Sequence, residues 1–90
     1  MSSPAEIIKK IASGHITTCD IRQDRHGYNC CFSGVVKGRL KTVFPTTTRQ
    51  GVRAWLTVAD ALNFIDEKIG YIGPVFKNGE LLREARYDHF

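Results

Sequence analysis

The chain has 90 residues, of which 42% are hydrophobic and 24% are charged, and its formal net charge is +4. These proportions are close to those of soluble globular domains, and they exclude a collagen-like repeat, a coiled coil and a disordered chain. No run approaches the roughly 18 apolar residues that span a bilayer, and the first residues lack the basic and apolar order of a signal peptide. We therefore expect one small domain over residues 1–90, located in the cytoplasm and not in a membrane.

A short amphipathic helix is predicted over residues 4–13. Ser2 or Ser3 is a suitable N-cap, Pro4 suits the first helical position, and Gly14 follows the expected end. Apolar residues recur between these signals at helical spacing, namely Ile7, Ile8, Ile11 and Ala12.

Three antiparallel strands are predicted next, over residues 16–22, 28–36 and 39–44. Each range is rich in β-branched, aromatic or alternating apolar residues, and polar or glycine-containing turns separate them. In the second strand the alternation places Cys30 on the core face and Cys31 on the opposite, exposed face.

The third strand carries a candidate site. If its apolar residues Leu40 and Phe44 pack under the helices, Arg39 and Lys41 point to the opposite face of the sheet, together with Lys37. The open face of the sheet is then expected to be basic.

Residues 45–69 allow two interpretations. Thr47 and Gln50 could form a capping box that starts one long helix, although the nearby Gly51 disfavours it. We favour a loop, a fourth strand over residues 52–56, and a helix that Thr57 caps. In that fourth strand the phase sends Arg53 and Trp55 outward.

The C-terminal part contains Asn78-Gly79 between apolar residues, which is a strong signal for a β-hairpin. Residues 83–90 form a tail that is either flexible or docked as an arm. The expected fold is therefore α+β: an N-terminal helix, a four-stranded antiparallel meander, a second helix packed on one sheet face, and a short C-terminal hairpin or arm.

The positive charge belongs to the meander. Residues 21–53 contain one acidic residue, Asp24, against Arg22, Arg25, Lys37, Arg39, Lys41, Arg49 and Arg53. Basic groups bind phosphates, and a tryptophan can stack on a base. The leading hypothesis is a small non-enzymatic protein whose basic sheet face contacts nucleic acid, with the site at Lys37, Arg39, Lys41, Arg53 and Trp55.

The rival hypothesis is a protein-interaction module, an inhibitor, an adaptor or a dimer, because Trp and Arg are also typical interface anchors. An edge strand of the meander could pair with its copy in a homodimer. No catalytic residues are proposed, since no third group accompanies His26 with Cys30 or Cys31. No metal site or cofactor is expected either, because the scattered cysteines and histidines lack ligand spacing.

Overall fold

The computed structural model describes residues 2–25, 27–45 and 54–86. Its elements are α1 (Pro4–Ala12), β1 (Thr18–Asp24), β2 (Gly27–Val36), β3 (Arg39–Val43), α2 (Val58–Asn63), a π-helical turn η1 (Phe64–Ile69), β4 (Val75–Lys77) and β5 (Glu80–Arg83). The α+β class is confirmed.

The sheet is mixed and has five strands in the order β3-β2-β1-β4-β5. β1, β2 and β3 form the expected antiparallel meander, but the predicted fourth strand does not complete it. Instead the C-terminal hairpin joins the sheet at the other side, where β4 lies parallel to β1 and β5 antiparallel to β4. A parallel neighbour needs a crossover connection, and the chain through α2 and η1 is part of it.

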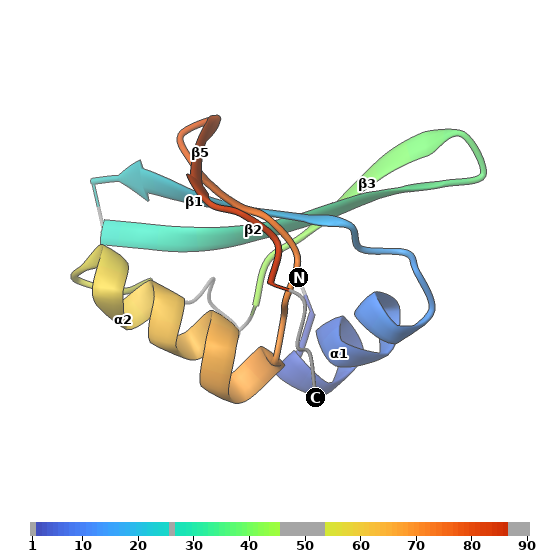
Figure 1. Cartoon of the computed structure of the whole chain (residues 1–90), viewed down its shortest axis with the longest axis horizontal. Coiled ribbons are helices and arrows are strands. Elements are labelled where there is room, and N and C mark those ends of the chain that lie inside the picture. The colour runs from blue at the N-terminus through green and yellow to red at the C-terminus, as the bar shows by residue number, and fades with distance from the viewer. Residues whose placement is uncertain (1, 26, 46–53, 87–90) are drawn as a thin grey trace.

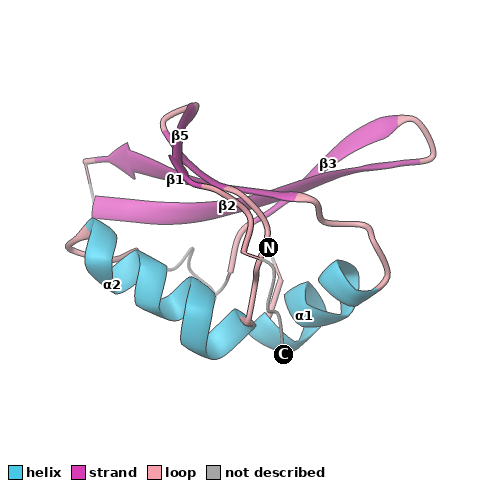
Figure 2. Ribbon diagram, in the orientation of Figure 1, coloured by secondary structure: helices cyan, strands magenta, loops and turns pink. Residues whose placement is uncertain are grey.

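Both helices cover the same face of the sheet, which leaves the other face open (Figures 1 and 2). The core lies between these layers and joins Cys19, Ile21, Cys30, Phe32 and Val75 of the sheet to Ile7, Ala61, Phe64, Ile65 and Ile69 of the helices. Tyr71 closes it, with its ring edge-on to that of Phe32 at 5.9 Å between centroids. The core position of Cys30 therefore agrees with the prediction, and Phe32 shares its face.

Both helices begin where their sequence signals predict. Ser3 caps α1 through a hydrogen bond that its hydroxyl accepts from the Glu6 N–H at 3.3 Å, and Thr57 caps α2 by accepting from the Asp60 N–H at 3.1 Å. Since Thr57 has an extended backbone, the interpretation as one long helix is wrong. The π-helical turn η1 that continues α2 ends before Gly70, whose φ of 74° is left-handed.

The C-terminal hairpin turns at Asn78 and Gly79, which both have positive φ, as the Asn-Gly signal predicts. The chain at the end of this hairpin is bound to η1 through the carboxylate of Asp66. Asp66 accepts two hydrogen bonds from the Arg83 guanidinium, at 2.8 and 3.1 Å, and one from Arg86 at 2.7 Å. The predicted tail is thus docked as far as Arg86, and residues 87–90 lie outside the described part of the chain.

The fourth strand predicted over residues 52–56 is reduced to one bridge in the described residues. Trp55 exchanges two backbone hydrogen bonds of 2.7 Å with Tyr28 at the start of β2. Residues 52 and 53 are outside the described part.

Candidate functional site

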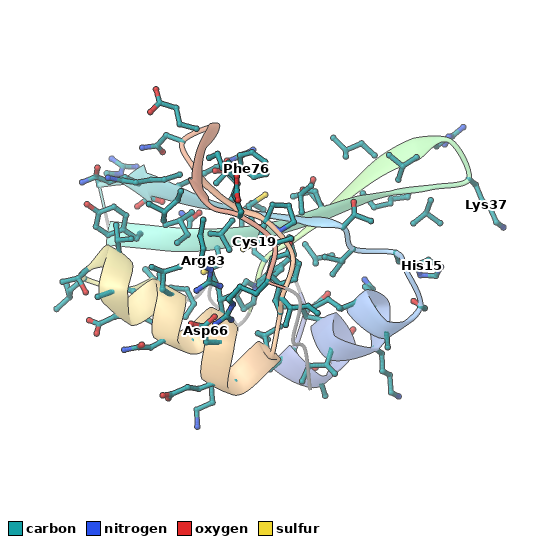
Figure 3. The ribbon with its side chains drawn as sticks, viewed as in Figure 1. His15, Cys19, Lys37, Asp66, Phe76 and Arg83 are labelled. Carbon is teal, nitrogen blue, oxygen red and sulfur yellow. The ribbon has the colours of Figure 1, made fainter. Side chains whose placement is uncertain are left out.

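The hairpin of β2 and β3 extends beyond the rest of the sheet. β1 pairs with β2 from Gly27 to Ser33, whereas the last part of β2 has β3 as its strand partner, as far as the turn at Lys37 and Gly38. Figure 3 shows Lys37 at the tip of this overhanging hairpin, away from α2. One face of the overhang lies on the side of the helices, and the other continues the open face.

Pairing with β2 settles which face the basic side chains of β3 occupy. Val43 pairs with Phe32 and packs against the core. Because side chains alternate along a strand, Lys41 and Arg39 lie on the same helix-side face as Val43. Leu40 points to the open face and is 71% exposed. The predicted phase of β3 is therefore wrong, and Arg39 and Lys41 do not lie on the open face.

The turn geometry explains this phase. Lys37 and Gly38 both have positive φ, 53° and 77°, which is the pattern of a two-residue type I′ turn. Such a turn fixes Val36 opposite Arg39 and Val35 opposite Leu40. In the overhang no core covers Leu40, so burial does not oppose that register.

The end of α1 is held against the helix-side face of this hairpin by its backbone. The carbonyl oxygen of Lys10 accepts the N–H groups of His15 at 2.8 Å and of Ile16 at 3.2 Å. The Thr17 N–H then donates to the Ser33 carbonyl oxygen at 2.8 Å. A Cβ placed on Gly34 would overlap the carbonyl oxygen of His15, so glycine lets the connection cross β2 closely.

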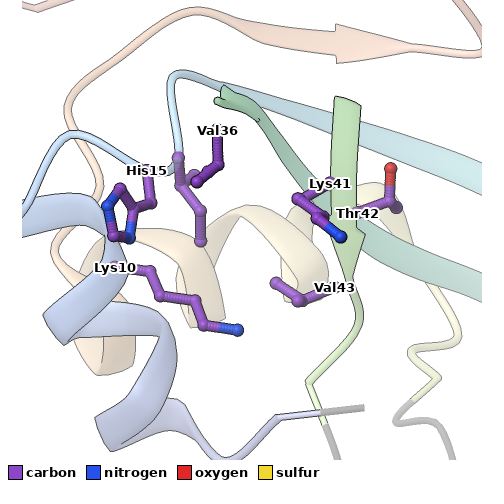
Figure 4. Close-up of a pocket in the computed structure, with 7 residues that line it drawn as sticks. Lys10, His15, Val36, Lys41, Thr42 and Val43 are labelled. Carbon is purple, nitrogen blue, oxygen red and sulfur yellow. The ribbon is translucent and has the colours of Figure 1, made fainter. Parts of the chain in front are cut away.

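A pocket of about 270 Å³ lies between this connection, the last turns of α1, and β3 (Figure 4). Its apolar lining comes from Ile16, Val36 and Val43, and its polar lining includes Lys10, His15 and Lys41. Figure 4 shows Lys10 extending from α1 towards β3, with the His15 imidazole beside it. Lysines from two elements that are far apart in sequence therefore meet at one pocket.

The charged side chains that line the pocket, among the described residues, are all basic. No carboxylate is among the described residues that line it. In the described ranges the ion pairs join Arg22 to Asp20, and Arg83 and Arg86 to Asp66, so none neutralises Lys10 or Lys41. We call Lys10, His15, Lys37, Arg39 and Lys41 the basic hairpin surface. An anion placed in the pocket would meet Lys10 and Lys41 and no carboxylate among the described residues that line it.

Trp55 does not belong to this surface. It was predicted to point outward beside Arg53, but it is half-buried, packs against the core, and its ring centroid lies 4.6 Å from that of Phe64. Its immediate neighbour Leu56, which alternation would place on the core face if Trp55 pointed outward, is 85% exposed. The predicted phase is therefore wrong here too, because the bridge to Tyr28 aims Trp55 at the helix side.

The surroundings of Trp55 also differ from those of the lysines. The shallow pocket beside it is lined by Asp60 and Glu67 as well as Lys68. Trp55 bridges Tyr28, whereas Lys41 pairs with Gly34, six residues further along β2, which corresponds to about 20 Å. Arg53 lies outside the described residues, so the structure brings together Lys37, Arg39 and Lys41 of the predicted site.

The open face carries a different chemistry. Hydroxyl groups lie across its centre, with Ser33 and Thr42 joined at 3.1 Å. Its charged residues include Asp20 and Arg22, which pair at 2.9 Å. Cys31 is on this face, as predicted, but it is 1% exposed rather than accessible, because a short side chain in an inner strand is covered by its longer neighbours.

His26, considered above as a partner of Cys30 or Cys31, lies outside the described residues, whereas the three cysteines lie within them. Cys19, Cys30 and Cys31 are all buried. A hydrogen bond with Cys30 and burial raise the pKa of the Cys19 thiol. A thiol with a raised pKa stays protonated, whereas nucleophilic attack needs the thiolate.

Sequence reasoning did not single out Lys10 and His15 as site residues. Lys10 is one of two lysines in the last turn of α1, which is a common place for cations near a helix dipole. Its approach to Lys41 depends on the crossing at Gly34, and that is a tertiary contact with no local sequence signal. A glycine inside a strand, where it weakens pairing, is the one local hint of a close backbone approach.

Comparisons with protein-family models, with curated proteins and with solved structures find no match to this chain. Within residues 2–25, 27–45 and 54–86, none of the helices has the length and apolar character needed to cross a membrane. The same ranges contain no cluster of three or more His, Cys, Asp or Glu side chains that could hold a metal ion.

Proposed function

We propose that this protein is a small binding protein that contacts nucleic acid through the basic hairpin surface. The observation that carries the proposal is the convergence of Lys10 and Lys41 on one pocket whose described lining contains no carboxylate. Lysine and arginine side chains that neutralise phosphates supply most of the affinity of proteins for nucleic acids of any sequence. Cations without an acidic partner are free to do this.

The shape of the overhang supports the same function. Beyond Ser33 the β2–β3 hairpin is a two-stranded ribbon that ends at Lys37, and the major groove of DNA admits such a ribbon. Arg39 and Lys41 follow Lys37 along the ribbon on the helix-side face. The surface therefore offers a row of cations along a protruding element, and the proposed contacts are with the phosphate backbone.

The salt dependence of binding tests this proposal. A fluorescence titration of a random single strand and a random duplex at several salt concentrations should give a logarithmic slope of about 0.9 per neutralised duplex phosphate, or about 0.7 for a single strand. Lys41→Ala should lower the slope by about one unit, because one phosphate contact is lost. Lys68→Ala is the matched control, since Lys68 is an exposed lysine on η1 outside the surface. Absence of binding at low salt would refute the proposal.

A protein-interaction module is the second candidate, and a different observation favours it. Val35 and Leu40 are cross-strand neighbours on the open face of the overhang, and they are 64% and 71% exposed. They lie beside the edge of β3, which could pair with a second copy of the chain. Sedimentation at increasing protein concentration tests this candidate: a dimer that Leu40→Ser abolishes would support it, and a monomer at all concentrations would reject it.

A further inference from the structure

The pocket within the basic hairpin surface has features that phosphate binding alone does not need. A phosphate requires cations at the surface, whereas this pocket has an apolar wall formed by Ile16, Val36 and Val43. Ile16 is buried, and Val36 and Val43 are half-buried. The ligand that uses the whole pocket is therefore an anion with an apolar or aromatic body.

The size of the pocket limits that ligand further. A volume of about 270 Å³ is just below the usual range of small-molecule sites, which begins at about 300 Å³. It suits one small planar group and is too small for a peptide segment or a duplex. His15 is exposed at the edge, and an imidazole ring is one of the aromatic groups on which unpaired bases stack.

From these features we infer that the pocket takes one unpaired nucleotide of a single strand, with the base against His15, Val36 and Val43 and its phosphate between Lys10 and Lys41. This inference rests on the proposed function and adds the form of nucleic acid that is preferred. Bases in a duplex are stacked and paired, so a duplex offers the pocket no base. The protein should therefore bind a single strand more tightly than a duplex.

The residues that line the pocket also indicate that binding depends little on the base sequence of the single strand. Thr42 is the hydroxyl-bearing residue among the described lining, and its hydroxyl is engaged with Ser33 on the other face at 3.1 Å. Apolar and stacking contacts accept any base, whereas sequence is read through hydrogen bonds to base edges. We expect similar affinities for single strands of different composition.

The decisive test fills the pocket without changing its charge. Val36→Phe places a larger side chain in the pocket, and Val35→Phe is the matched control, because Val35 is the adjacent residue and points to the opposite face. We expect Val36→Phe to weaken single-strand binding about tenfold, within the range that stacking of one base contributes, and to leave duplex binding unchanged. Val35→Phe should leave both affinities as in the wild type. A Val36→Phe variant that weakens both substrates equally, or neither, would overturn the inference.

A second measurement uses the wild-type protein and stays decisive if Val36→Phe fails to fold. In an NMR titration with thymidine monophosphate, the methyl signals of Val36 and Val43 and the His15 ring signals should shift, whereas inorganic phosphate should shift the lysine signals without moving those methyl groups. Equal shifts with both ligands would overturn the inference. The proposed function fails separately, when the wild type binds neither strand form at low salt. If instead both forms bind with one affinity, the surface contacts phosphates and the pocket is not used.

Discussion

The two ends of the β2 strand differ in what determines the direction of their side chains. From Tyr28 to Phe32 the strand lies over the helices, and burial assigns Cys30 and Phe32 to the core. From Gly34 to Val36 it belongs to an overhang, where the turn at Lys37 and Gly38 sets the register and leaves Leu40 exposed. Burial dictates the covered end, and local backbone geometry dictates the free end. Opposite the free end, β3 is therefore able to carry Arg39 and Lys41 on the helix-side face, where no core has to be filled.

The largest expected effect separates these two ends directly. Phe32→Ala should destabilise the protein by about 3–5 kcal/mol, because Phe32 is fully buried and its removal leaves a cavity beneath the Tyr71 ring. Leu40→Ala, at the free end, should change the free energy of unfolding by about 0.5 kcal/mol or less. Thermal melts of both variants measure this contrast, and similar melting temperatures would contradict it.

An intermediate effect is expected at the boundary between the two ends. Gly34→Ala introduces a Cβ that overlaps the backbone of His15, so the α1–β1 connection must move. We expect a loss of about 1–3 kcal/mol in denaturant unfolding, as for overpacking elsewhere. The control is Val35→Ala, because Val35 is the adjacent residue and its side chain is exposed. An unchanged midpoint for Gly34→Ala would show that the connection does not cross β2 so closely.

The smallest effect concerns the ion pairs of Asp66 with Arg83 and Arg86, beside the β5 edge of the sheet, and it depends on pH. Hydrogen bonds from Arg83, with the charge of Arg86, lower the pKa of Asp66 despite its partial burial. A lowered pKa in the folded state stabilises the protein above the unfolded pKa of about 3.9, and this contribution is lost as the pH falls below it.

Asp66→Asn should therefore cost about 1 kcal/mol or less at pH 7, because the ion pairs are partly exposed, and the difference from wild type should shrink in acid. Urea unfolding at pH 7 and pH 3 measures it. Glu67→Gln, the adjacent exposed carboxylate, is the control. An Asp66→Asn deficit that persists unchanged at pH 3 would assign the loss to packing and not to charge.

The sequence predicted those parts of the fold that local signals control. Ser3 and Thr57 mark helix starts through hydrogen bonds that their hydroxyl groups accept from backbone N–H groups, and Asn78-Gly79 marks a hairpin. The position of β4 beside β1 has no such signal, because it depends on how the second helix returns the chain to the sheet.

The candidate site shows the limit of strand patterns. The alternation in β3 was interpreted from Leu40 and Phe44, on the assumption that apolar residues mark the buried face. That assumption holds where helices cover the sheet, and it fails in an overhang. Trp55 was misplaced for a related reason, because one bridge to Tyr28, and not a full strand, determines its direction. Lys37, Arg39 and Lys41 were predicted from their charge together with a strand phase that is wrong for Arg39 and Lys41, whereas Lys10 and His15 needed the tertiary structure.

The unequal pairing of β2 has a consequence for local motion. From Gly27 to Ser33 this strand pairs with β1, and it has a second partner at Tyr28, through Trp55, and at Phe32 and Ser33, through β3. From Gly34 to the turn it pairs with β3 alone. Segments with few buried contacts and exposed backbone hydrogen bonds open at a small free energy without unfolding the rest. The hairpin tip can therefore open and close as a separate unit, with rapid amide hydrogen exchange, while Cys30 and Phe32 stay protected. The segment that carries Lys37, Arg39 and Lys41 can thus adjust its shape without unfolding the covered part of the sheet.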